Sequence, residues 1–156
     1  MKEKKTEFSF EEILKVNVNA FTEKKNGLTY LSWANAWNVF KKCYPNTIYE
    51  VIKNAEGLPY FVDEKLGIMV YTSVTVGDLN YEVWLPVMDG ANKPMKLDSY
   101  TYKGWSYNQG KKVQIEKICS PANMFDINKT IMRCLVKNLA MFGLGLYIYA
   151  GEDLPE

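Results

Sequence analysis

Three cationic side chains recur at four-residue intervals near the end of this sequence. Lys129, Arg133 and Lys137 lie in the segment 128–149, whose apolar residues recur at helical spacing. Wound as an α-helix, this segment places the three cations opposite an apolar arc of Ile127, Ile131, Cys134, Leu135, Leu139, Met141 and Phe142. Arg133 is the only arginine of the chain, so it is the one forked donor for an anion. The pattern indicates either an anion-binding row or a solvated helix face.

The boundaries of this helix follow from its flanking residues. Ser120–Pro121 is a typical helix start, and Asp126 offers a second one nearer Asn128. Gly143 and Gly145 are expected to end the helix, and residues 146–149 to form a strand. Asn138 falls at the centre of the apolar arc, where a buried amide must be hydrogen-bonded, so we expect it to have a structural role.

Residues 88–120 combine positive charge with aromatic rings. Six lysines stand against three acidic residues, interleaved with Tyr100, Tyr102, Trp105 and Tyr107, and Asn108–Gln109–Gly110 predicts the turn of a β-hairpin. Cations that follow a phosphate backbone and rings that stack on bases are typical of single-strand binding. The candidate residues are Lys103, Trp105, Tyr107, Lys111 and Lys112. The alternative is a hairpin whose rings pack on a neighbouring subunit.

Upstream of residue 88, the spacing of apolar residues predicts one helix followed by strands. A helix is expected from Ser32 to about Tyr44, with Trp33 and Trp37 on a face more typical of a core than of a stacking platform. Strands are expected at 47–53, 59–63, 68–76 and 79–85, and the two-residue turn Gly77–Asp78 pairs Val76 with Leu79, Val74 with Tyr81, Thr72 with Val83 and Val70 with Leu85. The fold class is therefore α+β: an antiparallel sheet with β-hairpins, packed against a long C-terminal helix and a shorter Trp-rich helix.

Length and composition fit one domain. Of the 156 residues, we expect 1–27 to form an arm or a short helix available for subunit contacts, 28–151 to form the domain and 152–156 to form a short acidic tail. The net charge of +1 implies that any nucleic-acid surface is a local patch. No run of residues reads as a signal peptide or a membrane span, which predicts a cytoplasmic protein.

The residue types and their spacing do not indicate a metal site, a disulfide framework or a nucleotide-binding motif. The chain has no histidine, its three cysteines lack C-x-x-C spacing, and it has no P-loop motif, so we expect no zinc site, disulfide framework, nucleotide cofactor or ATPase activity. Asp63, Glu82, Asp89 and Asp98 show no spacing typical of a magnesium site. A metal-dependent nuclease or other DNA-processing enzyme, and a protein-interaction module, remain the alternative functions.

Three stretches carry a resemblance to a known family. They are YLSWANAW (30–37), LPVMDGANK (85–93) and the segment 128–155. The chain resembles, from about Leu28 onward, the phage single-strand annealing proteins of the Sak-like (Sak-three-like) family, which is distantly similar to the Rad fifty-two annealing core. The resemblance implies a non-catalytic, ATP-independent protein that anneals strands in phage homologous recombination as a homo-oligomeric ring or filament.

The resemblance also implies where the partners bind. Lys129, Arg133 and Lys137, with the hairpin, would line a positively charged groove that takes single-stranded DNA or RNA. A phage exonuclease and a single-strand-binding protein are the implied protein partners, in the host cytoplasm.

Overall fold

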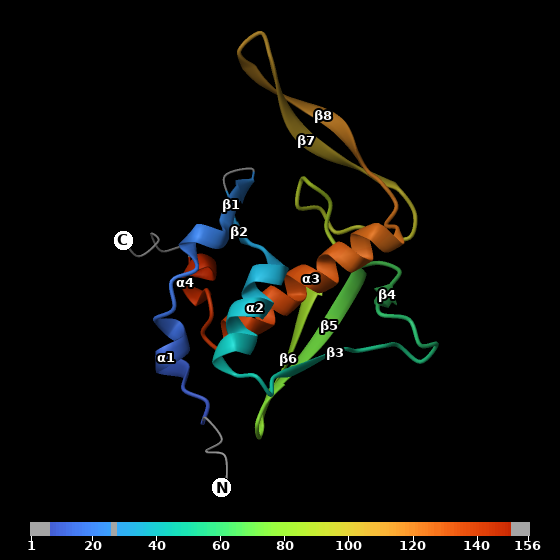
Figure 1. Ribbon diagram of the computed structural model, residues 1–156. Coiled ribbons are helices and arrows are strands. Elements are labelled where there is room, and N and C mark those ends of the chain that lie inside the picture. Colours follow the sequence, from blue (N-terminus) through green and yellow to red (C-terminus); the bar gives the residue numbers. More distant parts are fainter. Residues whose placement is uncertain (1–6, 26–27, 151–156) are drawn as a thin grey trace, which may run out of the picture.

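The centre of the structure is an antiparallel sheet in which strand β5 pairs along both of its edges (Figure 1). The structure is a computed structural model that describes residues 7–25 and 28–150. β5 (Gly67–Val76) pairs with β6 (Leu79–Pro86) along one edge, and with β3 (Ile48–Val51) and β4 (Phe61–Asp63) along the other. The register places Val76 opposite Leu79 and Val70 opposite Leu85. It confirms the hairpin predicted from the two-residue turn at Gly77–Asp78.

One face of this sheet is buried because side chains alternate along β5. Ile68, Val70, Thr72, Val74 and Val76 are all buried, whereas the residues between them are only partly covered. Helix α3 lies across the buried face and packs on both β5 and β6 (Figure 1). The predicted α+β class, with a long C-terminal helix on an antiparallel sheet, is confirmed.

Helix α3 (Met124–Met141) begins at a cap that differs from both predicted starts. Asn123 is the N-cap: its side chain accepts a hydrogen bond from the Asp126 N–H, and the Asp126 carboxylate accepts one from the Asn123 N–H. This reciprocal pair satisfies two backbone N–H groups at the start of the helix. Ser120 lies three residues before this cap and does not take part in it. Of the last two residues predicted to lie on the core arc, Phe142 is buried as expected, whereas Met141 is exposed at the last turn.

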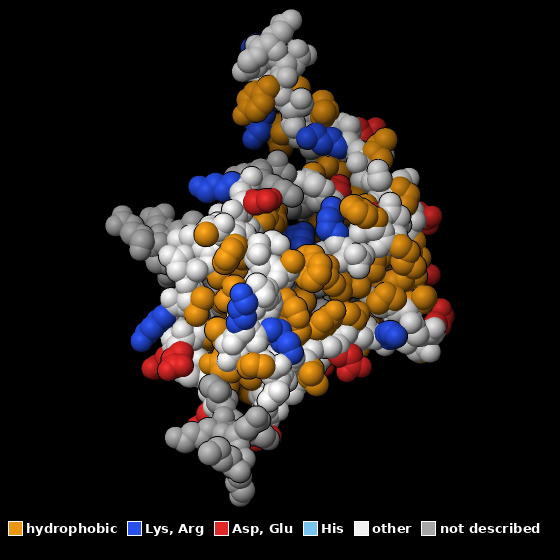
Figure 2. All heavy atoms as spheres, in the orientation of Figure 1, with side chains coloured by type: hydrophobic (Ala, Val, Ile, Leu, Met, Phe, Trp, Pro, Cys, Tyr) orange, Lys and Arg blue, Asp and Glu red, His pale blue; other side chains and the backbone are white. Residues whose placement is uncertain are grey.

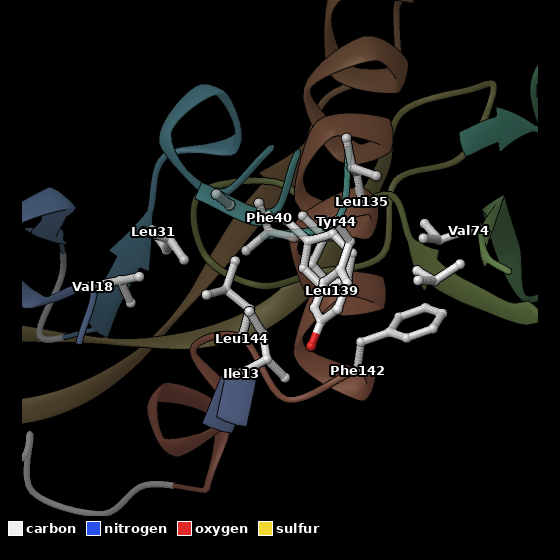
Figure 3. Close-up of a cluster of buried hydrophobic side chains, with 13 residues drawn as sticks. Ile13, Val18, Leu31, Phe40, Tyr44, Val74, Leu135, Leu139, Phe142 and Leu144 are labelled. Carbon is white, nitrogen blue, oxygen red and sulfur yellow. The ribbon is translucent and has the colours of Figure 1, made fainter. Parts of the chain in front are cut away.

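The first helices and the end of the chain pack around the C-terminal half of α3. α2 (Trp33–Cys43) crosses α3, and Figure 3 shows Phe40, Leu139 and Phe142 meeting between them. α1 (Phe10–Leu14) contributes Ile13 to the same cluster of buried side chains, and Val18, which immediately precedes the turn η1 (Asn19–Phe21), belongs to it as well. Gly143 has a φ of 114°, and a Cβ there would stand 2.8 Å from Ile13 Cγ2, so this helix end requires glycine.

The predicted strand at residues 146–149 is wrong, because this segment is the short helix α4 (Leu146–Tyr149). Gly143 and Gly145 both have positive φ, and together they turn the chain back toward α1 instead of toward a sheet edge. Tyr147 then donates its hydroxyl hydrogen to Asn19 Oδ1 and accepts one from the Val18 N–H. A run of four apolar residues does not distinguish helix from strand, and here the tertiary contacts decide.

Two further hairpins stand apart from the main sheet. β1 (Thr22–Lys25) pairs with β2 (Leu28–Leu31), and β7 (Tyr100–Asn108) pairs with β8 (Lys111–Cys119). Figure 1 shows that β7 and β8 project well beyond the rest of the molecule. Their turn lies at Gln109–Gly110, within the predicted turn. The predicted tail at 152–156 lies outside the described residues, and the predicted division at residue 27 stays a prediction.

Asn138 is fully buried against the sheet, as predicted. Its Nδ2 lies 3.1 Å from the Thr72 carbonyl oxygen and 3.0 Å from that of Tyr81, so one amide bonds to both central strands. Within the described part of the chain, its Oδ1 has no hydrogen-bond partner.

Replacing Asn138 should therefore destabilise the fold. Asn138→Ala removes the three hydrogen bonds that Nδ2 makes to Thr72 and Tyr81 and leaves a small cavity, so the free energy of unfolding should fall by about 1–3 kcal/mol in urea titrations. Asn138→Asp should cost more, because it places a carboxylate against two carbonyl oxygens. The exposed Asn128 of the same helix is the matched control, and equal effects of Asn138→Ala and Asn128→Ala would contradict this account.

The three cysteines should differ in reactivity. Cys43 is exposed, whereas Cys119 and Cys134 are buried, and burial raises the pKa of both buried thiols. Since the thiolate is the nucleophile, a higher pKa slows reaction with a disulfide reagent at mildly alkaline pH. We expect rapid labelling of one thiol in the native protein, lost in Cys43→Ser, and labelling of all three in denaturant. Rapid labelling of native Cys43→Ser would show that a buried site opens readily.

Candidate nucleic-acid interface

A groove of about 570 Å³ opens beside the first half of α3. Its walls are α3, the β1–β2 hairpin, the start of α2 and the loop that follows β6. The lining residues are Glu23, Leu28, Tyr30, Leu31, Ser32, Trp33, Met88, Asp89, Gly90, Asn92, Phe125, Asn128, Lys129, Met132, Arg133 and Val136. The loop wall has a fixed shape, because Asp89 Oδ1 accepts hydrogen bonds from the N–H groups of Ala91 and Lys93, each at 2.9 Å.

The predicted row of three cations is divided between two environments. Lys129 and Arg133 line the groove, whereas Lys137 points to the sheet edge, where its Nζ donates to the Trp84 carbonyl oxygen at 3.3 Å. The helix itself explains the division: each four-residue step turns about 40° beyond a full circle, so Lys137 lies about 80° around the axis from Lys129. The structure thus brings together two of the three predicted residues.

Both groove cations lie over aromatic rings. The Arg133 guanidinium carbon is 5.5 Å from the centroid of the Tyr30 ring, and Lys129 Nζ is 5.8 Å from that of Phe125. Among the residues that the structure describes, neither cation has a carboxylate partner. Their hydrogen-bond donors are therefore available to a ligand.

The aromatic lining of the groove was missed by sequence reasoning. Trp33 is 47% exposed and Phe125 is 73% exposed, so Trp33 does not occupy the predicted core position. It is the first residue of α2 and borders the groove, whereas Trp37, one turn later, is the more buried of the two. Helical spacing correctly predicted that Trp33 and Trp37 lie on the same side of α2. It could not show that the first turn of α2 borders a groove formed by other segments.

The charges in the groove are mixed. Lys129 and Arg133 stand on the α3 side, whereas Glu23 and Asp89 belong to the opposite walls. The N-terminus of α2 also meets the groove at Ser32, whose side chain makes no capping hydrogen bond, and the N-terminal end of a helix carries partial positive charge. An anion is therefore favoured along α3 and α2 and disfavoured near the two carboxylates.

The β7–β8 hairpin has one basic and aromatic face. Its register places Lys103, Trp105, Tyr107 and Lys112 on the same side of the ribbon, and Lys111 on the other. Lys112 Nζ lies 4.9 Å from the centroid of the Trp105 ring, and Tyr107 is 76% exposed. Four of the five predicted hairpin residues thus share a face, which we call the Trp105 face.

Residues on the opposite face of the hairpin contact the rest of the protein where the hairpin begins. Lys93 lies over the Tyr102 ring and Lys96 over the Tyr100 ring, at 4.7 and 4.8 Å. The Tyr100 hydroxyl donates to the Pro94 carbonyl oxygen, and burial together with the nearby Cys119 thiol raises the pKa of Tyr100 to about 12. Figure 2 shows Lys and Arg side chains on the hairpin and again below its base, interspersed with hydrophobic groups.

Two other features, a metal-binding cluster and a membrane-spanning helix, are absent from the described residues. No group of three or more His, Cys, Asp or Glu side chains there could hold a metal ion. No helix in residues 7–25 and 28–150 is long and apolar enough to cross a membrane.

Comparison with known proteins identifies the family. No curated protein and no solved structure matches this chain. The family model of the Sak single strand annealing protein, however, matches residues 8–156, which is nearly the whole chain. The chain therefore belongs to the Sak single-strand annealing protein family.

Proposed function

We propose that this protein binds single-stranded DNA and anneals complementary strands without ATP. The observation that supports this most directly is the pair Lys129 and Arg133, which face an open groove beside aromatic rings and have no carboxylate partner among the described residues. In a member of an annealing family, such a pair is suited to phosphate groups.

The proposed mechanism follows from what annealing requires. Two strands pair only when their bases are exposed and their phosphates are screened from each other, and the binding must be reversible enough to let mismatched strands separate. A few cations per protomer meet that condition better than a strongly basic surface. The net charge of +1 agrees with contacts that are local to the groove and the hairpin.

The Trp105 face of the β7–β8 hairpin is the second proposed contact. Its lysines can follow a phosphate backbone while Trp105 and Tyr107 offer exposed rings to bases. The hairpin and the groove are adjacent along the chain, because the loop after β6 forms a wall of the groove and then leads into β7. One strand of DNA could therefore contact both surfaces.

The proposal includes assembly of several copies into a ring or filament. Among the described residues, β7 and β8 pair only with each other, and Ile115 and Ile118 are exposed on them. An isolated two-stranded hairpin is marginally stable in water, so contact with a second copy would stabilise it. Repetition around an assembly would also join single grooves into a continuous path for the strand. The proposed setting is phage recombination in the host cytoplasm, where an exonuclease exposes strands and a single-strand-binding protein covers them.

Strand annealing can be tested directly. With complementary oligonucleotides that carry a fluorescence donor and acceptor, the protein should accelerate pairing in EDTA and without nucleotide. Complementary RNA strands in a parallel reaction determine whether the activity extends to RNA. Unaccelerated pairing at low salt would contradict the proposal, and Mg²⁺-dependent shortening of the strands would indicate a nuclease instead.

The two groove cations should account for part of the salt dependence. If each contacts one phosphate, Lys129→Ala with Arg133→Ala should reduce the slope of log affinity against log salt by about 1.4, at about 0.7 per contact for single strands. Lys137→Ala is the matched control, since its amine is already bonded to Trp84, and it should change the slope by less than about 0.7. Equal effects of Lys137→Ala and Arg133→Ala would contradict the division of the row.

A further inference from the structure

The groove beside α3 is poorly suited to a continuous phosphate chain, although two of its cations are available. Glu23 and Asp89 occupy the walls opposite Lys129 and Arg133, so a phosphate that crossed the groove would approach a carboxylate. Phosphates are favoured only along the α3 side. The remainder of the groove must suit a different part of a nucleotide.

That remainder is lined by aromatic and apolar groups. Tyr30 and Trp33 come from β2 and the start of α2, and Phe125 comes from the first turn of α3. Single exposed aromatic residues are common on protein surfaces, but here three converge on one cavity together with two cations. The volume of about 570 Å³ lies within the range of about 300–1,000 Å³ typical of small-ligand sites.

We propose that this groove is a nucleobase subsite, which holds one unstacked base of the bound strand against the rings of Tyr30 and Trp33. The adjoining phosphates lie along α3, at Lys129 and Arg133. Arg133 serves both parts, because its guanidinium lies over the Tyr30 ring and a guanidinium that packs on a ring can still donate from its edge to a phosphate. This inference rests on the proposed binding of single-stranded DNA and adds where a base is held.

The chemistry of the site predicts little discrimination among bases. Every base has a π-face, so stacking tolerates any sequence. Asp89, one of the two acidic groups that line the groove, uses Oδ1 to bind the N–H groups of its own loop. A subsite of this kind would space the strand along an assembly, one held base per protomer, and leave the intervening bases free to pair.

The test compares two strands that differ only in their bases. One is an oligonucleotide of mixed sequence, and the other has the same length and phosphates but abasic sites at alternate positions. Wild-type protein should bind the intact strand more tightly. Trp33→Ala with Tyr30→Ala should weaken binding of the intact strand by about 5- to 100-fold and leave binding of the abasic strand nearly unchanged.

Matched variants separate stacking from other effects. Trp84→Ala removes an indole that is 53% exposed on the sheet, outside the groove, and should preserve the preference for the intact strand. Trp33→Phe retains a ring and should restore most of the preference lost in Trp33→Ala. Urea midpoints and solution mass, measured for each variant, show whether fold and assembly are unchanged.

The unfavourable outcomes are distinct. Equal binding of intact and abasic strands by the wild type would overturn the subsite while the proposed annealing function stands. So would a preference that is undiminished in the Tyr30 and Trp33 double variant, or one lost entirely in Trp105→Ala alone, which would place the stacking on the hairpin. A change in solution mass in the double variant, without a change in preference, would assign the groove to contact between copies. Absence of any single-strand binding at low salt would refute the proposed function itself.

Discussion

The packing of α3 across β5 and β6 is the contact on which the rest of the structure depends. Apolar side chains supply most of the buried area, but they would allow the helix to rotate or slide. Asn138 removes that freedom, because its amide bonds to carbonyl oxygens of both strands, and Cys134 Sγ adds a contact to the Val83 carbonyl oxygen at 3.3 Å. With the helix fixed about its own axis, Lys129 and Arg133 have to face the groove.

The placement of charge is more informative than its total. A chain with a net charge of +1 has no long-range field that would attract a polyanion. Two cations beside aromatic rings, with no carboxylate partner in residues 7–25 and 28–150, and a hairpin face with Lys103 and Lys112 instead give short-range contacts that salt readily weakens. Such contacts suit a protein whose role requires a strand to be held and then released.

The sequence predicted features that are set by local chemistry. The register of β5 and β6 followed from a two-residue turn, and the burial of Asn138 followed from its place on the apolar arc. It failed where segments distant in sequence decide the outcome. The exposure of Trp33 depends on the β1–β2 hairpin and the loop after β6, and the position of Lys137 depends on the edge of β6. Periodicity places a side chain on a face, but only the tertiary fold determines what that face meets.

The segment between β6 and β7 belongs to the groove and to the hairpin at once. Its first part, around Asp89, forms a wall of the groove, and its second part, around Pro94, accepts the Tyr100 hydroxyl at the base of β7. The two parts are joined by the Asp89–Lys93 hydrogen bonds and by the bridge between Met88 and Pro94. One hydrogen-bonded segment therefore sets both the wall of the groove and the base of the hairpin, so the direction in which the hairpin projects is tied to the position of that wall.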